Sequence, residues 1–296
     1  MSWDWQTTTD EVLAGVDLSG KVVVVTGATT GLGLETARSL AAHGAHVVAT
    51  GRTEQKASDA LASVGVPDAE PLALELGSVA AAAAAAEMLR QRHPVIDVLI
   101  ANAGIMGCPF DRTVDGFERQ FGTNHLGHFV FTGGVAPSVA AAAGRIVNLS
   151  SVGHRRSGII WDDPNYRTRV YDKWESYGQS KTANILHALE LQRRLGPDGV
   201  LAFSVHPGVI GTDLGRYMTS DDVRELQARP VEVAPRRKSI PAGAATSVWA
   251  ATAPELADHP GAYLEDCRVS LASEHATSPL DAQRLWALSE ELVGGP

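Results

Sequence analysis

The fold of this chain is decided by the stretch KVVVVTGATTGLG, residues Lys21 to Gly33. Its first half is a continuous β-branched run of strand length, and its second half is a glycine-rich loop that opens directly into a helical pattern. Such glycines let the backbone turn sharply and approach a pyrophosphate, which the free N–H groups at the start of the helix then hold. The stretch therefore predicts a phosphate-binding loop, with a plain structural turn as the alternative; its expected binding residues are Gly27, Thr29, Thr30, Gly31, Leu32 and Gly33.

Apolar runs of strand length alternate with helical patterns along most of the remaining chain. Further strands are expected at 46–50, 72–74, 98–101, 145–149 and 200–205, and helices at 32–43 and 79–92. Strands that are apolar on both faces and separated by helices are typical of a parallel sheet covered on both sides. We therefore expect an α/β fold, a doubly wound parallel sheet (Rossmann fold), in a single domain over residues 1–296.

Two segments fall outside this alternation. Residues 1–19 precede the first strand and are expected to form an N-terminal arm across the edge of the sheet. Residues 214–241 are irregular, charged and proline-containing. An irregular insertion at the carboxyl edge of such a sheet predicts a substrate lid, with a surface excursion as the alternative.

Composition excludes several classes of protein. The 296 residues are 44% apolar, which is enough for a sizeable core, and the net charge of -9 argues against binding to nucleic acid. No uncharged stretch is long and apolar enough for a membrane span, and the acidic, polar start MSWDWQTTTDEV does not resemble a targeting peptide. Two cysteines, Cys108 and Cys267, predict free thiols of a reducing compartment. We expect a cytoplasmic protein without a membrane or nucleic-acid partner and, since no cluster has metal-ligand spacing, without a metal.

The second strand indicates the cofactor. A dinucleotide fold that selects NAD places an acidic residue about 20 residues after the glycine loop, where it accepts a hydrogen bond from the ribose 2′-hydroxyl. This chain instead has Arg52 there, and a guanidinium suits a 2′-phosphate. The sequence therefore favours NADP(H). In the alternative, Arg52 is merely solvated, Glu54 takes its place and the cofactor is NAD(H).

The segment YGQSK places Tyr177 and Lys181 four residues apart, on one face of a helix. A tyrosine has a pKa of about 10, and a neighbouring ammonium in a desolvated cleft is expected to lower it so that the phenol exchanges a proton near neutral pH. Ser151 ends the strand at 145–149 and is expected to hold a substrate oxygen beside the phenol. The alternative for this serine is a simple turn residue.

Together these motifs resemble those of the short-chain dehydrogenase/reductase family. The marks are the TGATTGLG loop, Asn102-Ala103-Gly104 after the fourth strand, Asn124, the serine at the end of the fifth strand, YGQSK, and Pro207-Gly208. Within the family, the chain resembles the retinol dehydrogenase and WW-domain oxidoreductase-like branch in its SSVGH and LEDC segments, its 154–176 insertion and its RLWALSEELV tail.

The resemblance implies a role for each matching residue. Tyr177 would be the acid/base, Lys181 would bind the nicotinamide ribose and lower the tyrosine pKa, Ser151 would orient the substrate oxygen, and Asn124 would hold a water of the proton relay. The implied cofactor contacts, besides the glycine loop and Arg52, come from Glu75, Leu76, Asn102, Ala103, Gly104, Tyr177, Lys181, Pro207, Gly208, Val209, Ile210 and Thr212. Many relatives have an aspartate near Glu75, so the adenine contact differs here.

The expected substrate is a lipophilic small molecule. Its carbonyl or secondary alcohol would exchange a hydride with NADP(H), and the expected pocket residues are Met106, His154, Trp161, Leu214 and Tyr217. In the alternative, Trp161 packs onto the core and His154 is a hydrogen-bonded structural group. Reduction of a conjugated C=C bond, or NADP(H) binding without turnover, would be other functions. The chain is expected either to form a homo-oligomer through the helices near Asn124 and Tyr177 or to be a monomer.

Overall fold

The computed structural model describes residues 3–222, 224 and 236–294. Its main sheet has the strand order β10-β9-β6-β5-β4-β1-β2-β3, parallel except for β10, which is antiparallel to β9. The order 3-2-1-4-5-6 within it is that of a doubly wound dinucleotide-binding sheet, so the predicted fold class is confirmed. The strands are β1 (Val22–Val25), β2 (His46–Gly51), β3 (Glu70–Ala73), β4 (Val98–Ala101), β5 (Arg145–Leu149), β6 (Leu201–His206), β9 (Tyr263–Glu265) and β10 (Arg268–Ser270).

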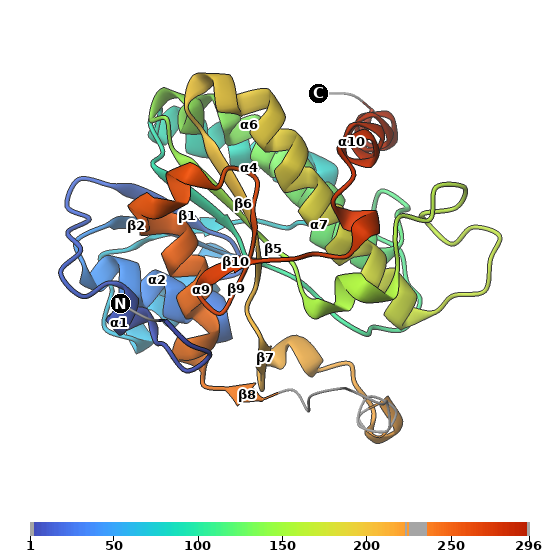
Figure 1. Cartoon of the computed structure of the whole chain (residues 1–296), viewed down its shortest axis with the longest axis horizontal. Coiled ribbons are helices and arrows are strands. Elements are labelled where there is room, and N and C mark those ends of the chain that lie inside the picture. The colour runs from blue at the N-terminus through green and yellow to red at the C-terminus, as the bar shows by residue number, and fades with distance from the viewer. Residues whose placement is uncertain (1–2, 223, 225–235, 295–296) are drawn as a thin grey trace.

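Helices cover both faces of the sheet (Figure 1). In β1, Val23 and Val25 pack into a core with α2 (Gly31–Ala42) and α9 (Ile240–Thr252), whereas Val24 points into a second core on the other face. This alternation explains why the strand is apolar on both sides. The other helices are α3 (Glu54–Ser63), α4 (Val79–Arg92), α5 (Arg119–Phe121), α6 (Gly127–Ala141), α7 (Lys173–Leu195) and α10 (Pro279–Val293).

The predicted elements match the observed ones closely. The strands at 98–101 and 145–149 and the helix at 79–92 have the predicted bounds, and the other predicted elements shift by one or two residues. Both cysteines are free and buried. No helix in the described part of the chain combines the length and apolar character that spanning a membrane requires.

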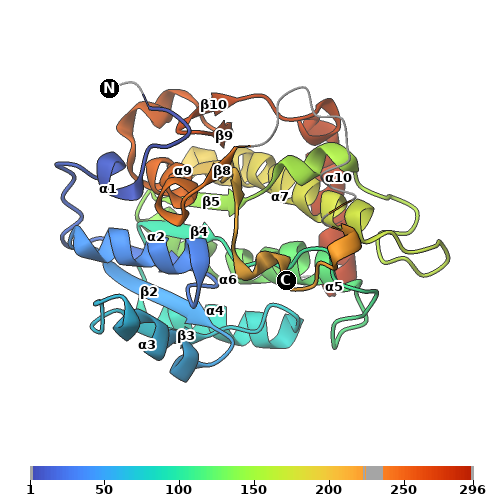
Figure 2. The same ribbon diagram turned by 90° about the horizontal axis from the view of Figure 1, so that it is seen from below.

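The N-terminal arm does not lie across the edge of the sheet as expected. Its short helix α1 (Thr9–Val12) packs instead on α9 and α2, one layer outside the sheet (Figure 2). Val12 and Leu13 are buried in the core that α2 and α9 share, and Thr9 donates a hydrogen bond to Glu35 of α2 at 2.6 Å. In this place the apolar residues of the arm are covered by two helices.

The segment expected to be a lid, residues 214–241, follows β6 and β7 (Val209–Ile210) in the chain and includes β8 (Arg237–Lys238). The chain leaves β6 through β7, and β8 returns to pair with β7 in parallel. Both short strands lie beyond the end of β6, at the bottom of Figure 1. Residues 223 and 225–235 lie outside the described residues, so the lid stays a prediction.

Candidate active site

The glycine loop and the polar residues that follow β4 meet at the carboxyl edge of the sheet. The strand order reverses between β1 and β4, and in open α/β sheets such a reversal is where ligands bind. Asn102 Nδ2 donates to Thr26 O at 2.8 Å, and Ala103 N donates to Thr26 Oγ1 at 2.9 Å. The loop after β4 therefore holds the loop after β1 in place.

The fit in this loop is too close for larger residues. Gly27 has a φ of +66°, and a Cβ there would lie 2.9 Å from Ala103 Cα. A Cβ on Gly33 would lie 2.4 Å from Asn102 Nδ2. Glycine is thus required where the backbone turns and where the helix approaches the strand.

The start of α2 is available to an anion. Thr30 precedes the helix and makes no side-chain capping hydrogen bond, so the first N–H groups of α2 lack the usual partner. A Cβ on the neighbouring Gly31 would lie 3.3 Å from Thr212 Cγ2. The uncapped start of α2 suits a phosphate group, and Thr212 lies beside it.

Arg52 lies beside the same loop. Ala28 N donates to Thr50 O at 2.9 Å, and a Cβ on Gly51 would lie 2.7 Å from Thr29 Cγ2, so the end of β2 contacts the glycine loop. Arg52 follows directly, is exposed, and forms no ion pair with the described part of the chain. Its guanidinium can therefore meet an anionic group that enters the loop.

Tyr177 and Lys181 are brought together on α7. They lie one helical turn apart and are both buried, each 4% exposed. Lys181 Nζ is 5.7 Å from the centroid of the Tyr177 ring and donates to Leu149 O at 3.1 Å. The amine is thereby fixed at the end of β5, next to the serine turn.

Burial dominates the electrostatics of this pair. It raises the pKa of Tyr177 to about 12, and a hydrogen bond with the Ser151 side chain lowers that pKa only in part. Burial also lowers the pKa of Lys181 to about 8. The prediction of an unusually acidic phenol is therefore wrong for the protein chain itself, because taking the phenolate out of water costs more than its hydrogen bond returns.

Asn124 joins the loop after β4 to α7. It lies in a π turn, Gly122–Leu126. Its Nδ2 donates to Ile105 O at 2.9 Å and to Ser180 Oγ at 3.0 Å, and its Oδ1 accepts from Ile105 N at 2.8 Å. These contacts place Asn124 as a support for the site, and its role in a proton relay stays a prediction.

His128 is a site residue that the sequence did not single out. Its Nδ1 is 3.0 Å from Asn124 O and its Nε2 is 2.9 Å from Thr26 Oγ1. Because a carbonyl can only accept, Nδ1 carries the proton and Nε2 accepts the Thr26 hydroxyl. Burial lowers the pKa of His128 to about 4, which keeps the ring neutral. In the sequence, only its position four residues after Asn124 indicated that His128 could lie at the site.

Comparisons with known proteins agree with this geometry. The family described as short chain dehydrogenase matches residues 21–223. The chain belongs to this family. Retinol dehydrogenase 12 of Mus musculus is 38% identical over 286 residues, covering 94% of this chain and 88% of the relative. The WW domain-containing oxidoreductase of Homo sapiens is 36% identical over 304 residues, covering 98% and 72%. The chain is thus a short-chain dehydrogenase of that branch and an oxidoreductase.

Two further similarities bear on the fold and the compartment. Short-chain dehydrogenase TIC 32 A of Brassica napus, named as chloroplastic, is 37% identical and covers 97% of this chain and 92% of the relative. An uncharacterised protein from Mycobacterium paratuberculosis has a crystal structure with a TM-score of 0.78 at 31% identity, covering 100% of this chain and 98% of that one. Since the first relative is assigned to an organelle, a cytoplasmic location stays a prediction for this short-chain dehydrogenase.

Two expected pocket residues of this short-chain dehydrogenase have partners within the protein. Trp161 packs on the core that α7 and α10 share, under the Arg284 guanidinium at 4.1 Å. His154 is fully buried, with Nδ1 2.7 Å from Ser151 O, while its Nε2 accepts from Ser273 N at 3.0 Å. His154 is not free to contact a substrate, because both of its imidazole nitrogens are engaged. Trp161 is only half-buried, so its place in a substrate pocket stays a prediction.

Trp174, on α7, is a buried neighbour of the turn at Gly107. It stands three residues before Tyr177, and its ring would be 3.2 Å from a Cβ on Gly107, which in turn would lie 3.9 Å from Met218 Cγ. The expected residues Leu214 and Tyr217 belong to the same segment as Met218 and are half-buried, as is Met106.

One group of metal-ligating side chains meets far from this site. His46, Glu70 and His93 lie at the amino end of the sheet with ligand atoms within 4.8 Å of one another. Both histidines bond to Glu70 Oε2, at 3.3 and 2.7 Å, and Arg92 pairs with Glu70 Oε1 at 3.0 Å. These contacts join the starts of β2 and β3 to the end of α4. The three side chains and Arg92 therefore hydrogen-bond to one another. The expectation that the protein binds no metal stays a prediction.

Proposed function

We propose that this short-chain dehydrogenase uses NADP(H) to interconvert a carbonyl and a secondary alcohol on a lipophilic small molecule, with Tyr177 as the general acid/base. The observation that carries the proposal is the buried Tyr177–Lys181 pair at the carboxyl edge of the sheet. Ser151 lies close by, since a Cβ on Gly153 would be 2.7 Å from the Tyr177 ring and 3.4 Å from Ser151 Oγ. When bound, the nicotinamide ring supplies or accepts the hydride.

The protein residues divide the remaining work. The glycine loop and the first turn of α2 would hold the pyrophosphate, and Arg52 would bind the 2′-phosphate. Ser151 would donate to the substrate oxygen and thereby orient the carbonyl toward the cofactor. Tyr177, whose raised pKa keeps it protonated at neutral pH, would then donate its proton to that oxygen.

The lipophilic substrate class is supported by apolar side chains around the site. Val152 follows Ser151 and is 43% exposed, and Val209 follows Gly208 and is 37% exposed. Exposed valines next to residues of the site suit a substrate with an apolar body.

The test is a panel of aryl, terpenoid and steroid ketones and their alcohols, followed by NADPH absorbance with the wild-type protein and Tyr177→Phe. Turnover with at least one ketone, lost in the variant, supports the proposal. Mass and NMR analysis of the product separates carbonyl reduction from reduction of a conjugated C=C bond. NADPH binding without oxidation across the panel would instead support a non-catalytic sensor.

A further inference from the structure

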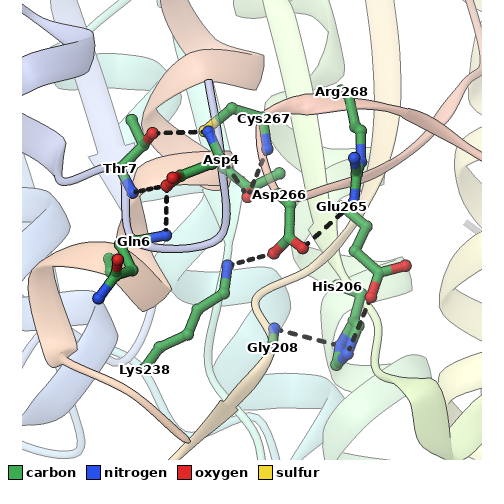
Figure 3. Close-up of polar contacts among 12 residues, drawn as sticks. Asp4, Gln6, Thr7, His206, Gly208, Lys238, Glu265, Asp266, Cys267 and Arg268 are labelled. Carbon is green, nitrogen blue, oxygen red and sulfur yellow. Dashed lines mark hydrogen bonds and ion pairs between the residues drawn. The ribbon is translucent and has the colours of Figure 1, made fainter. Parts of the chain in front are cut away.

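A buried ion pair outside the proposed machinery joins β8 to the hairpin between β9 and β10 (Figure 3). Lys238 Nζ lies 2.5 Å from Asp266 Oδ1, and the Lys238 side chain is only 5% exposed. Arg268 approaches the second carboxylate oxygen of Asp266 at 3.5 Å. We call the Lys238–Asp266 pair the clasp. Burying two charges costs desolvation free energy, so a buried ion pair adds little stability. Its role can instead be to fix the relative position of the two segments that it joins.

The lysine of the clasp contacts the Pro207–Gly208 turn directly. Lys238 pairs with Ile210 in the β7–β8 ladder. Its aliphatic stem also lies against Gly208, where a Cβ would come within 2.8 Å of Lys238 Cδ and Cε. Gly208 has a φ of +94°, so the turn itself has a special backbone conformation. The position of the Lys238 stem therefore constrains both the turn and β7.

The same turn is held from its other side by His206. Its Nδ1 accepts the N–H groups of Gly208 at 3.4 Å and of Val152 at 3.2 Å, the second of which follows Ser151. Because both partners are donors, Nδ1 carries the lone pair and Nε2 carries the proton, which faces Glu265 Oε1 at 3.7 Å. Gly208 thus lies between Lys238 and His206, and the neighbouring hairpin residues Asp266 and Glu265 contact these two side chains (Figure 3).

The hairpin has an unfavourable backbone for its sequence. Asp266 and Cys267 have φ values of +50° and +52°, between the paired residues Glu265 and Arg268. Two-residue turns with positive φ at both positions favour Asn-Gly, and a cysteine is strained there. Strain of this kind persists where the surroundings require it, and it is an observed outlier from which a functional hypothesis can start.

We propose that Lys238 and Asp266 are positioning residues for the nicotinamide side of the site. The clasp holds the Pro207–Gly208 turn and β7, where Val209 and Ile210 are expected to contact the cofactor, and His206 links this turn to Val152, the residue after Ser151. This inference rests on the proposed function. Neither residue touches the reacting atoms, and both act through the backbone that they hold.

The test compares three variants of the whole chain. Lys238→Met/Asp266→Asn opens the clasp while removing both charges, so that no buried charge is left unpaired. Lys238→Arg keeps the cation and is the conservative rescue. Cys267→Gly relaxes the hairpin and keeps the clasp, which makes it the matched control. Each is measured by thermal unfolding, by NADPH affinity from cofactor fluorescence, and by amide exchange over residues 208–210 without cofactor.

The open-clasp variant is expected to exchange faster over residues 208–210 and to bind NADPH about tenfold more weakly, as a small displacement of a binding group costs affinity. Where turnover is detected, KM for NADPH should rise by more than kcat falls. Lys238→Arg and Cys267→Gly should stay within about twofold of wild type. Unchanged exchange and affinity in the open-clasp variant would overturn the inference.

Two outcomes have their own controls. Should the open-clasp variant fail to fold, Asp266→Glu, which keeps both charges and moves the carboxylate by one methylene, provides the same comparison. A wild-type protein that binds no NADPH would refute the proposed function. In that case the exchange rates still decide whether the clasp holds the turn.

Discussion

Lys181 lies one turn of α7 beyond Tyr177, with its Nζ 5.7 Å from the centroid of the phenol ring and bonded to the backbone oxygen of Leu149. The amine is thus shared between the tyrosine and the end of β5. This arrangement fixes both side chains in a buried place, where each would be more stable uncharged. Charging either side chain in the folded protein therefore costs free energy.

Replacing Tyr177 with phenylalanine should remove the proton donor and little else. We expect kcat to fall by about 10²–10⁴-fold, because general acid catalysis contributes that much, while the affinity for NADPH changes by less than about threefold. Steady-state kinetics and cofactor fluorescence measure the two effects. A variant that retains full turnover with every ketone would remove Tyr177 from the mechanism.

Replacing Lys181 with methionine should stabilise the protein at pH 7. Burial lowers the pKa of Lys181 to about 8 from 10.5, so the folded protein bears a desolvated ammonium at neutral pH, which costs about 3 kcal/mol. Between pH 8 and 10.5 the unfolded chain binds more protons at this site than the folded one, so the wild type gains stability there as the pH rises.

The excess stability of Lys181→Met over the wild type should therefore shrink between pH 8 and 10.5. Urea unfolding at pH 7 and pH 10 measures the difference. An excess that is constant across this range would show that Lys181 titrates as it does in the unfolded chain.

Replacing Arg52 with alanine should affect NADPH and not NADH. Loss of charge-assisted hydrogen bonds to a 2′-phosphate is expected to weaken NADPH binding by about tenfold or more. Lys56→Ala, one turn into α3 and also exposed, is the matched control for a general loss of positive charge. Equal weakening of NADPH and NADH by Arg52→Ala would contradict its assignment to the phosphate.

Replacing Thr26 with valine should destabilise the fold. The change keeps the shape but leaves Ala103 N and His128 Nε2 without partners, at about 2–4 kcal/mol for the two buried groups. Thr132→Val is the control, since Thr132 is also fully buried but its Oγ1 has no hydrogen-bond partner in the described structure. Urea unfolding should show a clear loss for the first and none for the second; equal effects would sink the argument from hydrogen bonding.

The phosphate-binding unit and most of the sheet could be predicted from the sequence because they follow from local rules. A β-branched, apolar run favours a buried strand, and glycine is favoured where the backbone turns with positive φ, as at Gly27. The Tyr177–Lys181 pair was equally accessible, since residues four apart share a helix face.

The contacts that complete the site join residues far apart in the sequence. Thr26 and His128 are 102 positions apart, and the clasp connects β8 to a hairpin whose strained turn carries no helix or strand signal. The directions in which Trp161 and His154 point depend on α10 and on the Ser273 loop, which pack against them only in the folded chain.

The groups that this protein brings to its site follow from its sequence: a glycine loop, an arginine after β2, and a tyrosine and a lysine on one helix. Their protonation and their supporting contacts depend on the folded chain. The pKa of a side chain depends on how much water the whole fold removes from it, and burial of Tyr177 raises its pKa against the expectation from its neighbour alone.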